Sequence, residues 1–421
     1  MGRSALLLLL AVTSTARADT VDATVSTLIA GRQDPRDGRV YTVVPVYETL
    51  TLTVGDVRLR HVDDLRIVVS GWGELALGDP REGLATGDLD VGFIEGKLLD
   101  RRFVLRIGRQ FVFGGAARAR QIDGGSLTVR LWRGLAVNAY GGAPVTPRFA
   151  TQQGDAIAGA RLFWRRSFNT ELGLSFVHVL DKGRVAREDL GADARWQAHP
   201  TLALTDYALL SLTELRLAEG DLAATWQPLR MLEVRADYRR TAPDLFLPRS
   251  SILSVFSQES HDEAGASIYL RPHARVRLTA DYHVIVGAAG VDAAGAGNRA
   301  GVKLNVYLGP AFETSLGAEA RLLTLPGNGY TQARLYLIHR ILPTLAITLD
   351  ADAIVLEQPL TGYAGQTFSF TGAGTLGWDF HPGWRVVGTA IGDVTPFVER
   401  RLEGMVKLVY NQTFHVREER K

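Results

Sequence analysis

The sequence predicts an all-β fold, a closed antiparallel transmembrane β-barrel of about 18–22 strands. Three observations lead to it. Apolar and polar residues alternate in segment after segment, the chain begins with the residue pattern of an export signal, and short and long connections alternate along it.

The alternation is clearest in Arg275–Val286, which reads RVRLTADYHVIV. Successive side chains of a strand point to opposite faces, so this segment has one apolar face and one charged face. Ile285 interrupts the pattern on the charged face. The apolar residues stand at every second position: Val276, Leu278, Ala280, Tyr282, Val284 and Val286. This period favours a strand over a helix.

The same alternation recurs over most of the chain, and no helical pattern of useful length follows the N-terminal segment. The clearest further segments are 190–196, 232–239, 302–308, 316–322 and 345–353, and less regular ones are 67–77, 103–111, 155–163, 170–178 and 403–410. The predicted strands run about 10–14 residues, close to the roughly 9–11 that cross a tilted bilayer. Aromatic residues fall mostly near their ends, as in the belts at membrane surfaces.

A soluble secreted β-protein is the alternative to a barrel in lipid. In this chain one face of the strands carries many charges of both signs, and the other face carries almost none. A soluble sandwich needs shorter strands with frequent turns, and a propeller or β-helix would show a fixed repeat. Since an open strand edge cannot remain unpaired in hydrocarbon, the sheet is expected to close.

The N-terminus predicts a secretory signal peptide over residues 1–18, with the barrel occupying 19–421. Arg3 supplies a positive charge, Ala5–Val12 is apolar, and Ala16-Arg17-Ala18 is a cleavage pattern. A membrane anchor would need about 20 apolar residues. We therefore expect export through the periplasm and insertion, by strands, in the outer membrane of a Gram-negative bacterium.

Composition excludes several classes of function. The 421 residues include no cysteine and carry a formal net charge of +2. The lack of cysteine excludes disulfides, thiol nucleophiles, cysteine metal sites and a lipid-modified cysteine. The small net charge gives no sign of a nucleic-acid partner. We expect no cofactor.

The connections suggest which end of the barrel faces outward. Short turns, many containing proline, alternate with longer polar or glycine-rich links, the layout of tight periplasmic turns and extended outer loops. The links are predicted near 31–38, 79–87, 114–124, 143–153, 242–262, 287–298 and 357–365. We expect 242–262 in particular to narrow the outer mouth.

One stretch resembles a known family. Arg106–Gly115 reads RIGRQFVFGG, and Asp123-Gly124-Gly125 and Tyr140-Gly141-Gly142 follow it. This strand and loop resemble the diffusion-porin and alginate-export-type outer-membrane barrels of Gram-negative bacteria. The resemblance implies a channel for saccharides or small anions. The C-terminus departs from that family, because the predicted last strand, Met405–Phe414, is followed by His415–Lys421 rather than ending on an aromatic residue.

The candidate site is the set of charges on the face opposite the apolar one, which we predict to line the pore. Charged rings in a water-filled lumen set ion preference and orient solutes, and opposed acidic and basic rows create a transverse field. Alternatively, these charges pair across strands and simply fill the interior. The predicted pore-lining residues are Arg106, Asp193, Arg195, Glu233, Arg235, Asp237, Arg239, Arg275, Arg277, Asp281, His283, Lys303, Glu319, Arg321, Arg334, Asp350 and Asp352.

An enzyme is the other class considered. Asp281 and His283 share a face and could imitate a hydrolase dyad, but no serine motif accompanies them. We predict no catalytic residue and no metal site.

The leading function is a porin-like channel that passes small polar solutes or saccharides passively. The alternatives are the barrel of a polysaccharide-export or surface machine, with periplasmic export partners, and a structural barrel with a closed lumen. Membrane lipid and lipopolysaccharide are the expected surroundings.

Overall fold

A computed structural model describes residues 20–36, 39–59, 62–77, 85–145, 155–167, 169–242, 260–287, 296–311, 313–325, 329–359, 366–396 and 398–415. Strands dominate these ranges, with one short 3₁₀ turn, η1 (Gly115–Ala117). The strands are β1 (Thr20–Arg36), β2 (Arg39–Leu59), β3 (Val62–Leu77), β4 (Ala85–Leu98), β5 (Phe103–Val112), β6 (Arg120–Arg130), β7 (Leu135–Pro144), β8 (Ala156–Ser167), β9 (Thr170–Asp181), β10 (Arg184–His199), β11 (Leu202–Ser211), β12 (Arg216–Leu229), β13 (Leu232–Thr241), β14 (His261–His273), β15 (Val276–Val286), β16 (Ala296–Leu308), β17 (Thr314–Thr324), β18 (Tyr330–Leu342), β19 (Leu345–Leu356), β20 (Phe368–His381), β21 (Trp384–Thr395) and β22 (Val398–His415).

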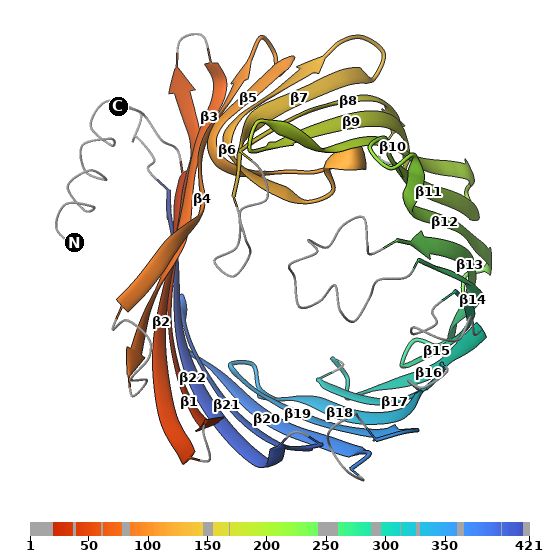
Figure 1. The fold of residues 1–421 in the computed structure, drawn as a ribbon. Helices are drawn as coiled ribbons and strands as arrows, with labels where there is room; N and C mark the ends of the chain where they lie inside the picture. The colour runs from red at the N-terminus through yellow and green to blue at the C-terminus, as the bar shows by residue number, and fades with distance from the viewer. Residues whose placement is uncertain are drawn as a thin grey trace.

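The strands form one closed sheet (Figure 1). Each strand pairs antiparallel with its neighbours in sequence, and β1 pairs with β22 to close the ring. The 22-stranded barrel confirms the predicted class, lies at the upper limit of the predicted strand number, and has the expected even count. The part of the chain that the structure describes has no helix long and apolar enough to cross a membrane.

Strand β15 shows how the two faces of the wall differ. Tyr282 and Val286, on the outer face, are each 53% exposed, whereas His283 and Ile285, between them on the inner face, are 3% and 7% exposed. An apolar residue, Ile285, therefore stands among the charged residues of the inner face because side chains near this end of the strand are buried there. Unlike a soluble protein, the barrel exposes its large apolar side chains on the outside, as contact with lipid requires.

Aromatic side chains gather on the outer face at the end where the short turns lie. Trp384 lies 4.5 Å from Tyr410 and 6.2 Å from Phe380, measured between ring centroids. Trp132, Trp196, Trp226 and Trp378 are also exposed at this end of their hairpins. Such rings favour the membrane–water interface, so they mark one boundary of the apolar band.

The predicted long link at 31–38 is wrong. Strand β1 continues to Arg36 and β2 begins at Arg39, and the two residues pair directly. Polar side chains do not end a strand whose backbone is still paired, so the hairpin continues through the polar stretch. The predicted link at 114–124 is shorter than expected, because β6 begins at Arg120.

Several other predictions fall on residues outside the described ranges. These include the signal peptide, most of the links at 79–87, 143–153, 242–262 and 287–298, and the tail after His415. The expectation that 242–262 narrows the mouth therefore stays a prediction.

The outer face can be tested with one arginine. Leu335 in β18 is 63% exposed on that face. Leu335→Arg is expected to lower the free energy of unfolding from a bilayer by about 2–4 kcal/mol, because the cation enters hydrocarbon. The measurement is urea unfolding from phosphocholine vesicles, in which the heat-modifiable gel shift reports the folded fraction at each urea concentration. Ile338→Arg, on the inner face of the same strand, is the control and should cost less. Equal losses would contradict the assignment of the two faces.

Candidate functional site

The segment between β5 and β6, residues 113–119, crosses the inside of the barrel wall. Its 3₁₀ turn η1 contacts β9, β10 and β11. In the sheet, β6, β7 and β8 lie between β5 and these strands, so the contact spans the concave side of the wall. We call residues 113–119 the inserted segment.

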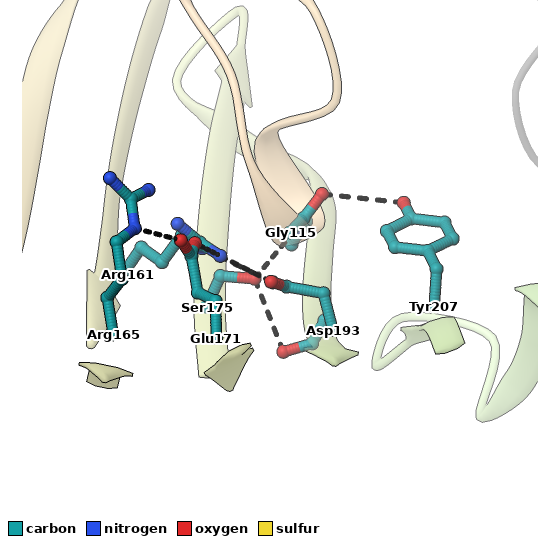
Figure 2. Close-up of polar contacts among 9 residues, drawn as sticks. Gly115, Arg161, Arg165, Glu171, Ser175, Asp193 and Tyr207 are labelled. Atoms are coloured by element: carbon teal, nitrogen blue, oxygen red, sulfur yellow. Dashed lines mark hydrogen bonds and ion pairs between the residues drawn. The ribbon is translucent and has the colours of Figure 1, made fainter. Parts of the chain in front are cut away.

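Backbone groups of the inserted segment bond to side chains of the wall (Figure 2). The Ala116 N–H donates to Ser175 Oγ at 2.6 Å, and the Tyr207 hydroxyl donates to the Gly115 carbonyl oxygen at 3.4 Å. Ser175 Oγ in turn donates to the carbonyl oxygen of Gly191 at 3.2 Å. Arg118 forms an ion pair with Glu219 of β12. These bonds hold the turn at one position on the wall.

Two glycines allow the close approach. Gly115 has φ +55°, and a Cβ there would lie 2.0 Å from Ser175 Oγ. On the wall, a Cβ at Gly191 would lie 2.4 Å from the Ala116 nitrogen. Neither distance is possible for a real side chain, so the inserted segment needs glycine on both sides of the contact.

An apolar cluster lies beneath the inserted segment. Ala116 and Ala117 are each 2% exposed and belong to one cluster with Val177 and Leu209, while Tyr207 packs against it. Burial of this apolar surface adds a non-directional stabilisation to the hydrogen bonds. The inserted segment is therefore part of the folded wall.

A recess of about 590 Å³ opens beside the inserted segment, and Arg161 of β8 lies at its charged centre. Arg161 Nη2 donates to Glu171 Oε1 at 2.8 Å, and its Nε donates to Asp193 Oδ1 at 3.2 Å. Arg165 pairs with the same Glu171 (Figure 2). The guanidinium carbon of Arg161 also lies 4.9 Å from the centre of the Phe163 ring. Two carboxylates and an aromatic ring thus fix the direction of this cation.

The rest of the recess is polar and mixed in charge. Arg106 and Arg195 line it together with the neutral side chains of Asn138 and Thr128. Arg106 Nε donates to Glu95 Oε2 at 3.1 Å. The wall of this recess therefore presents fixed hydrogen-bond donors and acceptors, and its charges largely neutralise one another.

The register of the sheet places the predicted pore-lining residues. All except Arg275 lie within strands, and Arg275 lies in the turn between β14 and β15. Directly opposed residues share a face, and one such row joins Thr279, Lys303, Glu319, Arg334 and Asp352. The exposed apolar residues occupy the other face of the same strands. That these charges act on a solute stays a prediction.

The structure brings several of these residues together as ion pairs. Arg334 Nε donates to Asp350 Oδ1 at 2.9 Å, and Arg239 Nη2 donates to Asp221 Oδ2 at 3.1 Å. His283 Nε2 lies 3.2 Å from Asp237 Oδ2. Further contacts join Arg321 and Lys303 to Glu319, Arg235 to Asp237, and Gln332 to Asp352. Cross-strand pairing, the alternative interpretation of these charges, thus occurs along this face.

Sequence reasoning missed the centre of the first recess. Arg161, Arg165 and Glu171 were outside the predicted set because their strands alternate less regularly. A signal was nevertheless present, since Arg161, Phe163 and Arg165 alternate with Leu162 and Trp164. The inserted segment had no comparable signal beyond its small residues.

Comparison with known proteins supports the fold. No protein-family model matches the chain, and no curated protein matches it. The P pilus usher (PapC) translocation pore is 11% identical, with a TM-score of 0.51, and the match covers 94% of this chain and 100% of that one. Pseudomonas aeruginosa OpdQ is 10% identical, with a TM-score of 0.45, and the match covers 94% of this chain and 100% of OpdQ. Acinetobacter baumannii OccAB3 is 11% identical, with a TM-score of 0.46, and the match covers 94% of this chain and 99% of OccAB3.

At this level of identity the likeness concerns the fold alone. The likeness to the usher pore agrees with the closed barrel of this chain.

The position of the inserted segment can be tested by chemical labelling, since the chain has no cysteine of its own. Ala116→Cys is expected to react slowly with a water-soluble maleimide, because Ala116 is buried where the inserted segment contacts the wall. Adding Gly191→Leu should raise the rate about tenfold or more by displacing the segment.

Gly404→Leu is the control for that experiment, because a Cβ at Gly404 meets nothing within 4 Å. Rapid labelling in the parent Ala116→Cys protein would contradict the docked position.

Proposed function

We propose that this barrel is an outer-membrane channel that passes small polar solutes or saccharides passively. The observation that supports it best is the first recess, where Arg161, Glu171 and Asp193 present fixed charges beside the inserted segment. A closed-off interior would have no need for a polar recess of about 590 Å³. Export by residues 1–18 and insertion among outer-membrane lipids belong to the same proposal.

The mechanism needs no covalent step. A solute that enters the lumen loses part of its hydration, and inward guanidinium and carboxylate groups replace it. The inserted segment reduces the cross-section next to β8–β10, so the solute passes close to Arg161 and Arg195. Arg161 is held by two carboxylates and does not move into the passage. The proposal gives Asp281 and His283 no catalytic role.

Planar-bilayer recording tests this function directly. The folded wild-type barrel is expected to show stable open steps. A correctly folded but silent barrel would contradict the channel and favour an export barrel or a closed structural barrel.

The inserted segment gives a sharper prediction in the same recordings. Gly191→Leu should raise the single-channel conductance by about half or more, because the displaced segment no longer narrows the lumen. The double variant Ser175→Ala, Tyr207→Phe removes the two hydroxyl groups that bond to the backbone of the segment and should act in the same direction without adding bulk.

Gly404→Leu, on the outer face, should leave the conductance unchanged. Unchanged conductance in both of the other variants would show that the inserted segment does not narrow the conducting path.

A further inference from the structure

A second recess, of about 650 Å³, lies in the wall formed by β12–β16, the green to teal part of the ring in Figure 1. Its cationic lining consists of Arg230, Arg271, Arg277 and Lys303. Arg230 lies in the turn between β12 and β13, and Arg277 is the second residue of β15. The recess is therefore at the short-turn mouth, which faces the periplasm in barrels of this layout.

The charges of this recess are not balanced as those of the first recess are. Glu233 is the one carboxylate among the described residues that line it. Within the described ranges, Arg230, Arg271 and Arg277 have no carboxylate at ion-pair distance. Lys303 lies 3.7 Å from Glu319, which Arg321 contacts more closely. The recess thus presents an excess of positive charge to the lumen.

Two tyrosines give the recess a second chemical character. The guanidinium carbon of Arg277 lies 4.9 Å from the centre of the Tyr307 ring, which orients the Arg277 side chain. Tyr269, from β14, lines the same recess and is 38% exposed. Guanidinium groups bind carboxylate and phosphate oxygens through paired N–H donors, while an exposed aromatic ring packs against the apolar face of a sugar or another ring.

We propose that this recess binds the carboxylate or phosphate group of a small ring-bearing solute at the short-turn mouth of the lumen. Arg271 and Arg277 contact the oxyanion, and Tyr269 packs against the ring. The inference deepens the proposed function by naming a class of solute, and it rests on that function for its role in passage. Binding itself does not require the barrel to conduct.

The location of this recess at the short-turn mouth makes the charge that a solute first meets differ between the two ends of the lumen. An anionic solute that arrives from the short-turn side meets the excess positive charge at once, whereas one from the loop side reaches it only after crossing the length of the lumen. Field lines in a narrow, low-dielectric opening strengthen this difference. Current through the channel should therefore be blocked more strongly when the solute is added on the short-turn side.

Isothermal titration of the folded barrel in detergent micelles tests the site with three probes that share one ring: glucuronate, glucose 6-phosphate and glucose. Glucuronate and glucose 6-phosphate are expected to bind, and glucose to bind at least about tenfold more weakly, because the oxyanion supplies the contacts with the arginines. The double variant Arg271→Gln, Arg277→Gln should lower the association constants of both anions about tenfold or more.

Arg385→Gln is the matched control. Arg385 lies near the short-turn end of β21, on another part of the wall, and pairs with Asp379. This variant should leave anion binding unchanged. If the double variant does not show the heat-modifiable shift of a folded barrel, Arg271→Gln and Arg277→Gln are measured singly, and each should weaken the binding of both anions.

The results separate this inference from the proposed function. Anion binding that is equal in the wild type and the arginine variants, or equal for glucose and the two anions, overturns the site even if the barrel conducts. Binding that depends on the two arginines in a barrel without open steps supports the site and contradicts the channel. Binding of one anion alone supports the site and identifies whether a carboxylate or a phosphate is recognised.

Discussion

The pairing of every backbone N–H and C=O group is the constraint on which the rest of this structure depends. In hydrocarbon no water can satisfy a free strand edge, so the sheet must return to its beginning. The ladder between β1 and β22, from Thr20 opposite His415 to Arg32 opposite Glu403, meets this requirement. Closure also fixes the register, because a slip of one residue would move a whole strand's charges from the lumen into lipid.

Closure leaves the inner face free to vary, and this chain uses that freedom in two ways. Next to β8–β10, arginines and carboxylates lie within bonding distance of one another, and small residues admit the inserted segment. At the short-turn end of β12–β16, arginines and tyrosines face the lumen with one carboxylate, Glu233, among the described residues that line the second recess. One continuous sheet therefore carries a neutralised region and a cationic region on its inner face, while its outer face is mainly apolar.

The fold could be predicted because its main signal is local. Alternation such as that of Val276–Val286 reports the direction of each side chain, and the barrel class and strand range follow from its recurrence. The polar stretch Arg32–Arg36 misled the prediction, because composition does not show where backbone pairing ends. The inserted segment could not be predicted, since it depends on a contact between Ala116 and Ser175 that no local pattern records.

The inserted segment also bears on the mechanics of the ring. It links the end of β5 to β9–β11 across the inside of the curved wall. The wall between β5 and β11 therefore cannot flatten unless the contacts of the inserted segment break. The described part of β19–β22 has no comparable link across the inside of the wall. A Cβ placed there on Gly388, Gly392 or Gly404 would meet nothing within 4 Å. Lateral pressure from the surrounding bilayer is therefore expected to bend the glycine-rich side and leave the cross-section beside Arg161 unchanged.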